Sequence, residues 1–384
     1  MPSATPTAPR HRQAGQILVL AVLGMIAMIG GVAMLIEGGN AYAQQRGVQN
    51  GADAAANTGA MVLAQKLAGV TKTDADVAAA IAFSRNANGL NTNSAYYTDV
   101  TGKPISAVGV VTTSGFAAEV GGGPNNPLAA IPPGAQGVHD GGGRVFGTSF
   151  GRVVGINQMG ALADATAVTG RLTGGNFLPI VFPVNIVDCV VNGDLGIGEA
   201  AWPLSQPPLA GSDHPDGQEF IVPLCKTGSG SFMILDLDPS ATCPEEVTNP
   251  PAIQFDTFPT DVTSDNGNNC AGQVVPPVNA LHGTVVLIPI CDGACVTTGG
   301  SNATYHIIKV AAFFVDYMDD SGTSNPSSMC DFGVSPNYGT TIVPIRGNGS
   351  SSCLVGWFMR YINAGPVGAG PVGNSDAIGI QLVK

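Results

Sequence analysis

The residue best suited to act as a nucleophile is Ser149, because glycines flank it on both sides. Residues 147–151 read Gly-Thr-Ser-Phe-Gly and fit the G-x-S-x-G nucleophile elbow, and a glycine run at 141–143 resembles an oxyanion loop. In a hydrolase, Ser149 would attack an acyl carbon with a later histidine as base. The elbow requires a parallel sheet built from alternating strands and helices, and this pattern is absent from the chain. A glycine-rich strand and turn is therefore favoured, and we expect no catalytic residue.

Acidic residues and histidines are candidates for metal binding, but their spacing supports this role only weakly. Asp236, Asp238 and Ser240 lie in the segment ILDLDPS, which could hold a cation, although a strand ending in an Asp-Pro turn explains the same letters. The histidines are isolated and lack the spacing of paired ligands. We expect no metal and no cofactor, while calcium binding stays open at two acidic groups, Asp194 with Glu199, and Asp316 with Asp319 and Asp320.

All eight cysteines lie between Cys189 and Cys353. An even number confined to one region is typical of disulfides formed in an oxidising compartment, although eight cysteines allow 105 connectivities. Only Cys291 and Cys295 are close enough in sequence to suggest a local bridge, and the alternative is a metal site that adds His282 or His306. The disulfide candidates are Cys189, Cys225, Cys243, Cys270, Cys291, Cys295, Cys330 and Cys353.

The composition favours a folded, turn-rich domain and argues against nucleic acid as a partner. The net charge is −12, and the lysines and arginines beyond the N-terminus are scattered singly, whereas phosphate binding needs clustered basic residues. The chain holds 53 glycines and 28 prolines without a period, which indicates many turns between short strands. From Phe177 onward, apolar strand candidates recur between these turns. We expect an α+β fold with a mostly β second half, as a sandwich or an irregular sheet.

An uncharged segment near the N-terminus predicts a membrane anchor. Residues 16–36 form about 21 residues without charge, which as a helix measure about 31 Å and match the hydrocarbon core. Arg10 and Arg12 before this span place the N-terminus in the cytoplasm by the positive-inside bias. A signal peptide cleaved near 41–43 (Ala-Tyr-Ala) is the alternative, but the apolar run is longer than a signal sequence needs. We therefore expect a single-pass protein of the cytoplasmic membrane with its C-terminal domain outside.

The helical period continues beyond the anchor, over residues 40–67, and it defines two faces. One face carries small apolar residues, namely Val48, Ala52, Ala55, Gly59 and Val62, and the other carries Arg46, Asn50, Asp53 and Asn57. Alanine and glycine at contact positions allow close packing against a partner helix or against the chain's own domain. A further small stripe in the span, at Gly24, Ala27 and Gly31, would let a second membrane helix approach.

The order and spacing of these residues resemble the N-terminal signature of the TadE/TadG-like proteins of Tad (Flp) pilus assembly. The match covers about 50 residues, with Glu37 where the family usually has aspartate and Gly51 where it usually has alanine. The residue five positions after Gly15 is Leu20, whereas a processed pilin has glutamate there, so the resemblance favours the larger, unprocessed kind. The matching positions are Gly15, Gln16, Glu37, Gly38, Gly39, Tyr42, Arg46, Gln49, Asn50, Ala52, Asp53, Ala54 and Ala55.

The resemblance implies a non-catalytic role in pilus assembly. Partners would be pilin, pseudopilin or pilus platform proteins that pack on the N-terminal helix, with homo-oligomers through the same helix as a further option. A membrane-anchored adhesin or structural protein, or a serine hydrolase using Ser149, are the alternatives. The expected domains are a cytoplasmic tail (1–15), a transmembrane helix (16–36), an Ala-rich helix (37–67), a small pilin-like α/β module (68–175) and a disulfide-containing β domain (176–384).

Overall fold

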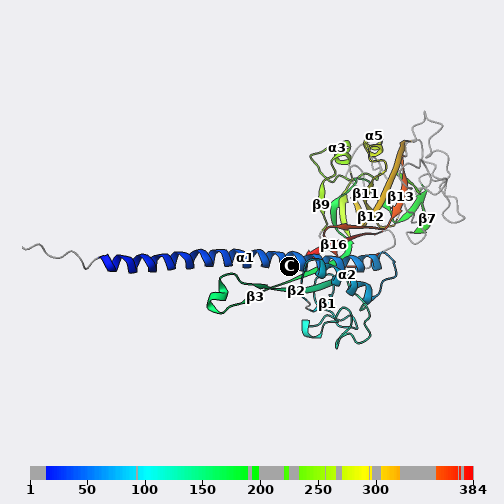
Figure 1. Ribbon diagram of the computed structural model, residues 1–384. Helices are drawn as coiled ribbons and strands as arrows, with labels where there is room; N and C mark the ends of the chain where they lie inside the picture. Colours follow the sequence, from blue (N-terminus) through cyan, green and yellow to red (C-terminus); the bar gives the residue numbers. More distant parts are fainter. Residues whose placement is uncertain are drawn as a thin grey trace, which may run out of the picture.

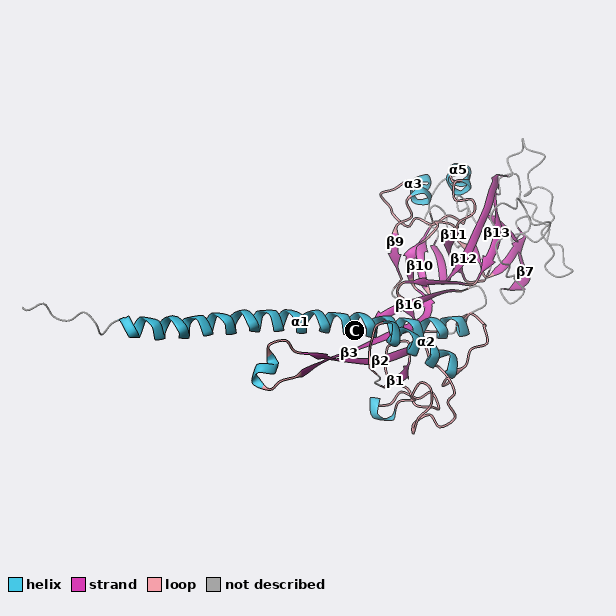
Figure 2. Ribbon diagram, in the orientation of Figure 1, coloured by secondary structure: helices cyan, strands magenta, loops and turns pink. Residues whose placement is uncertain are grey.

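The computed structural model shows a long helix that projects from two packed β-sheets (Figure 1). It describes residues 14–91, 94–188, 193–198, 220–224, 233–255, 257–264, 270–293, 295, 304–320, 352–370, 372 and 376–383. Helices dominate the N-terminal part and strands the remainder (Figure 2). The expected α+β class is confirmed.

Helix α1 (Ala14–Leu67) runs without a break from the apolar span into the Ala-rich segment. It contains no proline, so the backbone hydrogen-bond ladder is uninterrupted. The large apolar side chains between Leu18 and Ile36 are all at least 50% exposed. Among the described helices, α1 is the one long and apolar enough to cross a membrane, with a mean hydropathy of 2.6 in its best window.

The C-terminal half of α1 lies on a six-stranded sheet, called here the first sheet. The strand order is β1-β2-β3-β16-β14, with β15 beside β3, and the pairs are antiparallel except β14 with β16. Its strands are β1 (Ala95–Thr98), β2 (Gly137–Gly147), β3 (Gln158–Leu172), β14 (Tyr361–Ala364), β15 (Val367–Gly368) and β16 (Ala377–Val383). Strands β2 and β3 form a long hairpin with the 3-10 helix η2 (Gly151–Val154) at its tip.

Helix α2 (Asp74–Ala87), which periodicity predicts over 74–86, is fixed to this sheet by buried polar pairs. Asp74 accepts a hydrogen bond of 2.6 Å from the Tyr97 hydroxyl, and Arg85 forms an ion pair with the fully buried Asp140. Burial raises the pKa of Tyr97 and of Asp140, while the Arg85 guanidinium acts to lower the pKa of Asp140. These pairs hold α2 to β1 and β2 of the sheet, and α1 contacts both α2 and that sheet.

A second six-stranded sheet carries the core of the C-terminal half. The order is β5-β11-β12-β13-β8, with β10 beside β12. Its strands are β5 (Phe182–Pro183), β8 (Phe220–Leu224), β10 (Thr260–Thr263), β11 (Val285–Cys291), β12 (Thr304–Asp320) and β13 (Ser352–Met359). The smaller elements are η1 (Ser114–Phe116), β4 (Gly174–Asn176), β6 (Asn185–Asp188), β7 (Gly193–Gly198), β9 (Ala252–Gln254), and the helices α3 (Cys243–Thr248), α4 (Cys270–Gln273) and α5 (Val275–Asn279).

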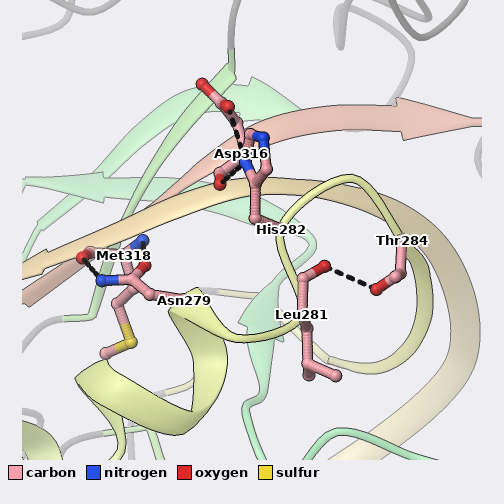
Figure 3. A network of polar contacts seen from close by, with 6 residues as sticks. All are labelled: Asn279, Leu281, His282, Thr284, Asp316 and Met318. Carbon is pink, nitrogen blue, oxygen red and sulfur yellow. Dashed lines mark hydrogen bonds and ion pairs between the residues drawn. The ribbon is translucent and has the colours of Figure 1, made fainter. Parts of the chain in front are cut away.

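The end of α5 and the turn that follows are held to the long strand β12 by side chains that bind its backbone groups (Figure 3). The Asn279 amide donates to the carbonyl of Met318 and accepts from its N–H, at 3.0 and 2.6 Å. His282 Nδ1 lies 2.6 Å from the carbonyl oxygen of Asp316 and 3.3 Å from its carboxylate. Asp316 thus contacts His282, whereas for Asp319 and Asp320, the other members of the acidic group, only the backbone in β12 is described.

The two sheets are joined in a way that the expected domain boundaries do not reflect. The expected β domain includes residues 361–383, but β14, β15 and β16 return to the first sheet, where β16 pairs with β3. Between the sheets, Asp376 binds Arg171 Nε at 3.2 Å and Lys309 Nζ at 2.9 Å, and all three side chains are largely buried. The division at 175/176 is therefore corrected, because the last strand completes the sheet that β1, β2 and β3 begin.

The described cysteines form disulfides. Cys291 is bonded to Cys295, as their spacing predicts, and Cys243 is bonded to Cys270 and so ties α3 to α4. The metal site that would use Cys291 and Cys295 is therefore ruled out. Cys189, Cys225 and Cys330 lie outside the described residues, and of Cys353 only the backbone in β13 is described.

Replacing Asp376 should weaken the contact between the two sheets and so lower the stability of the protein. Asp376→Asn removes the buried carboxylate charge that binds both Arg171 and Lys309, and we expect a loss of about 3–5 kcal/mol in the free energy of unfolding. The measurement is chemical denaturation of the detergent-solubilised protein. The control is Asp261→Asn, which breaks an exposed pair with His306 and should cost less than about 1 kcal/mol. Equal losses for the two variants would contradict the assignment.

Candidate interaction site on the long helix

The residues of the N-terminal motif occupy one stretch of α1 and separate onto different faces. The stretch from Glu37 to Asp53, called here the exit segment, begins directly after the apolar span. Gly38 and Gly39 are exposed, and Ala54 is half-buried. Gly15 and Gln16 belong to the first turns of α1, where only the backbone is described. What each remaining motif residue contacts decides what it can do.

The small face of α1 is covered by the chain's own fold. Ala52 and Ala55 have no exposed surface, and Ala52 packs with Ala165 and Ala167 of β3. Strand β3 contributes an alanine at every second position from 161 to 167, so these alanines share one face, and that face meets α1. Small side chains on both elements allow the helix axis to approach the sheet closely. Of the two surfaces that the sequence left open for this stripe, a partner helix or the chain's own domain, the structure shows the chain's own domain.

Gly51 shows how close the approach is. A Cβ atom at this position would lie 2.8 Å from Leu90 Cδ1, well inside contact distance, so even an alanine would force Leu90 to move. Leu90 packs with Val48 of the same helix face and Ala161 of β3. The glycine that replaces the usual alanine of the motif is thus explained by the leucine that fills its space.

Polar side chains of the exit segment hold the β2–β3 hairpin alongside the helix. Gln45 donates to the carbonyl of Leu162 at 2.7 Å, and Gln49 donates to the carbonyl of Asp164 at 3.2 Å. Gln44 accepts a hydrogen bond of 3.2 Å from Arg144 Nη1. These glutamines bind backbone carbonyls or a distant arginine. Such partners leave no regular spacing of residue types in the sequence, so the sequence did not predict these contacts.

The row ends at Glu37, where the helix leaves the apolar span. The Glu37 carboxylate accepts hydrogen bonds from the backbone N–H groups of Ser149 and Phe150, at 3.1 Å from each to Oε2. The acidic residue of the motif therefore fixes the tip of the hairpin beside the end of the span. Its role is contact with the chain's own backbone, since a carboxylate receiving two N–H donors is a strong, directional acceptor.

A narrow exposed stripe remains on the exit segment. Tyr42, Arg46 and Asn50 follow one another at intervals of four residues and are all exposed, with Tyr42 at 64%. The Arg46 guanidinium lies over the Tyr42 ring, 5.5 Å from its centre. We call these three residues the exposed stripe.

Asp53 lies beside this stripe, half-buried, and accepts a hydrogen bond of 2.8 Å from Gln49. It borders a pocket of about 550 Å³ that Asp164, Thr166 and the end of β16 also line. Across the described part of the chain, no group of three or more His, Cys, Asp or Glu side chains could hold a metal ion. The described lining of this pocket thus includes the carboxylates of Asp53 and Asp164 but not the three or more ligands that a metal site needs.

Residues 15–62 match the Tad family model. Its description reads "Putative Flp pilus-assembly TadE/G-like". The resemblance read from the motif is thus confirmed over the span, the exit segment and most of the small face, which together are called here the Tad-like segment. Comparison with curated proteins and with solved structures gives no match.

The other candidates for chemistry lie away from the Tad-like segment or serve the fold. Ser149 is at the turn of an antiparallel hairpin, not between a parallel strand and a helix as a nucleophile elbow requires. The Asp238 carboxylate accepts from the N–H and the hydroxyl of Ser240, which confirms the turn, although Ile234 and Leu235 before it form isolated bridges and not a strand. Asp194 lies in β7, where only the backbone is described, and Glu199 lies outside the described residues.

Enlarging a small-face alanine should weaken the fold. Ala56→Leu adds volume where α1 meets Ala165 and Ala167, and we expect a loss of about 1–3 kcal/mol in the free energy of unfolding. Ala43→Leu, on the exposed side of the same helix, is the matched control and should change stability little. Chemical denaturation in detergent measures both. A destabilised Ala43→Leu with an unaffected Ala56→Leu would mean that the small face is free.

Removing the Glu37 carboxylate should release the hairpin tip. In Glu37→Ala the N–H groups of Ser149 and Phe150 lose their acceptor, so their amide hydrogens should exchange faster with solvent. Hydrogen–deuterium exchange with mass spectrometry follows the peptide 148–157. Residues 104–111, on the connection between β1 and β2, serve as the internal control and should exchange as before. Unchanged exchange at 148–157 would show that Glu37 does not hold the tip.

Proposed function

We propose that this chain is a single-pass protein of the cytoplasmic membrane that acts without catalysis in the assembly of a Tad (Flp) pilus. The observation that carries the proposal is the division of the Tad-like segment. Its small face is buried on the first sheet, whereas the apolar span and the exposed stripe are left for other molecules. The C-terminal half of this helix thus has one face buried on the first sheet and another face exposed to solvent.

The membrane part of the proposal rests on the span. Its apolar side chains project into solvent with no protein around them among the described residues, and burying them in lipid removes that apolar surface from water. Arg10 and Arg12 favour a cytoplasmic N-terminus. The disulfides Cys243–Cys270 and Cys291–Cys295 support an extracytoplasmic location for both sheets, since disulfides persist in oxidising compartments.

The partner-binding part of the proposal rests on the exposed stripe. Tyr42, Arg46 and Asn50 present an aromatic ring, a cation and an amide in a row along one helix, and aromatic side chains and arginine are enriched at protein interfaces. Gly24, Ala27 and Gly31 leave room for a helix beside the span. A pilin, a pseudopilin or a platform protein would supply that helix, and a second copy of this chain is the other option.

The absence of catalysis is part of the proposal. Ser149 is the chain's best nucleophile candidate, and its N–H is used to bind Glu37 while its turn lacks the surroundings of a hydrolase. Labelling of the whole protein with a serine-reactive phosphonate should leave Ser149 unmodified. Stoichiometric labelling at Ser149 would support the hydrolase alternative.

Pilus assembly itself is tested in the native host. Deleting the gene should abolish surface pili in electron micrographs, and Arg46→Glu should reproduce that loss because it reverses the charge in the centre of the exposed stripe. Lys66→Glu makes the same change at an exposed position in the last turn of α1 and is the matched control. A photoreactive residue in place of Asn50 should cross-link to a pilin, a pseudopilin or a platform protein.

The outcomes separate the alternatives. Normal pili in the deletion strain would remove the assembly role and favour a surface adhesin. Pili lost equally in Arg46→Glu and Lys66→Glu would show that the effect is not specific to the stripe. Protease applied to the outer surface of a sealed cytoplasmic membrane should digest both sheets, and their protection would overturn the proposed orientation.

A further inference from the structure

The tip of the β2–β3 hairpin, residues 148–157, lies beside α1 at the end of the apolar span. The hairpin extends from the first sheet along α1 toward its N-terminus (Figure 1). The Glu37 carboxylate accepts from Ser149 N–H and Phe150 N–H, and Glu37 follows directly after Ile36, the last apolar residue of the span. The height of the tip along the helix is therefore set by two hydrogen bonds.

The tip presents apolar side chains to solvent. Phe150, Val153 and Ile156 are 40%, 85% and 52% exposed, and Arg152 beside them is also exposed. A loop that only reverses the chain direction is ordinarily polar, because exposed apolar side chains gain nothing from water. Three large apolar residues within one turn indicate a surface that is covered in the working protein.

The turn that carries these residues has a defined structure, with its own hydrogen bonds and a 3-10 helix. The Ile156 N–H donates to the Gly151 carbonyl at 2.9 Å, the Thr148 hydroxyl donates to the Ile156 carbonyl, and η2 lies between them. Gly155 closes η2 with φ of 86°, a conformation that favours glycine. The apolar side chains are thus presented from a turn that is closed by hydrogen bonds within it and by those to Glu37.

We propose that this tip inserts Phe150, Val153 and Ile156 into the lipid interface at the outer surface of the membrane, as a second contact beside the transmembrane helix. The inference rests on the proposed membrane span, because the tip reaches lipid only if α1 crosses the bilayer up to Ile36. Apolar side chains enter the boundary between headgroups and acyl chains, and Arg152 meets the lipid phosphates. Two contacts at one level restrict the tilt of α1, and with it the direction in which both sheets face.

The test uses the unmodified full-length protein in lipid bilayers. The chain is reconstituted into nanodiscs of phosphatidylethanolamine and phosphatidylglycerol that contain a phospholipid with a photoactivatable diazirine on its acyl chain. After illumination, mass spectrometry should find lipid adducts in two regions, the span at 18–36 and the tip at 148–157. Residues 104–111 hold the exposed Val108 and Val110 on the connection between β1 and β2, and they should carry none.

A variant separates insertion from mere proximity. In the triple variant Phe150→Ser, Val153→Ser and Ile156→Ser, the tip adducts should be lost while the span adducts remain. Tip adducts that persist in this variant would overturn the proposal, since they would not depend on the apolar side chains. Span adducts without tip adducts in the unmodified protein would overturn it as well. Absence of adducts in the span would instead contradict the transmembrane helix, and so the proposed function on which the inference rests.

Discussion

The close packing of small residues between α1 and β3 is the interaction on which the rest of the structure depends. Ala52, Ala56 and Ala60 of the helix meet alanines of the strand, so helix and sheet approach without large side chains between them. Because the helix passes unbroken into the span, this contact also sets how the sheets sit relative to the anchor.

Polar contacts hold the β2–β3 hairpin along the same helix. Gln45 and Gln49 bind the backbone of β3 within the alanine row, and beyond that row Glu37 binds the backbone of the hairpin tip. The motif residues thus have two separate duties. The small ones and the acidic one organise the chain's own fold, whereas Tyr42, Arg46 and Asn50 stay exposed and are the ones we propose for contact with other proteins.

The second sheet is coupled to this arrangement by a buried group of charges. Asp376 stands between Arg171 of β3 and Lys309 of β12, and the Arg171 Nη2 group also donates to the carbonyl of Ile308 at 3.1 Å. Such buried charges are costly unless they remain paired, so they favour one arrangement of the two sheets over others. The second sheet therefore has a defined orientation relative to the first sheet and to α1.

The sequence by itself determined what depends on neighbouring residues: the apolar length of 16–36, the helical period of 40–67, the helix at 74–86 and the Cys291–Cys295 bridge. It did not reveal β13, because Gly356 interrupts its apolar run, nor the hairpin contacts of Glu37, because hydrogen bonds to a distant backbone leave no pattern in side-chain spacing. Only the tertiary structure decided what covers the small face of α1. A stripe of alanine fits any closely approaching surface, and pairing of β16 with β3 across some 200 residues of chain brought the first sheet to it.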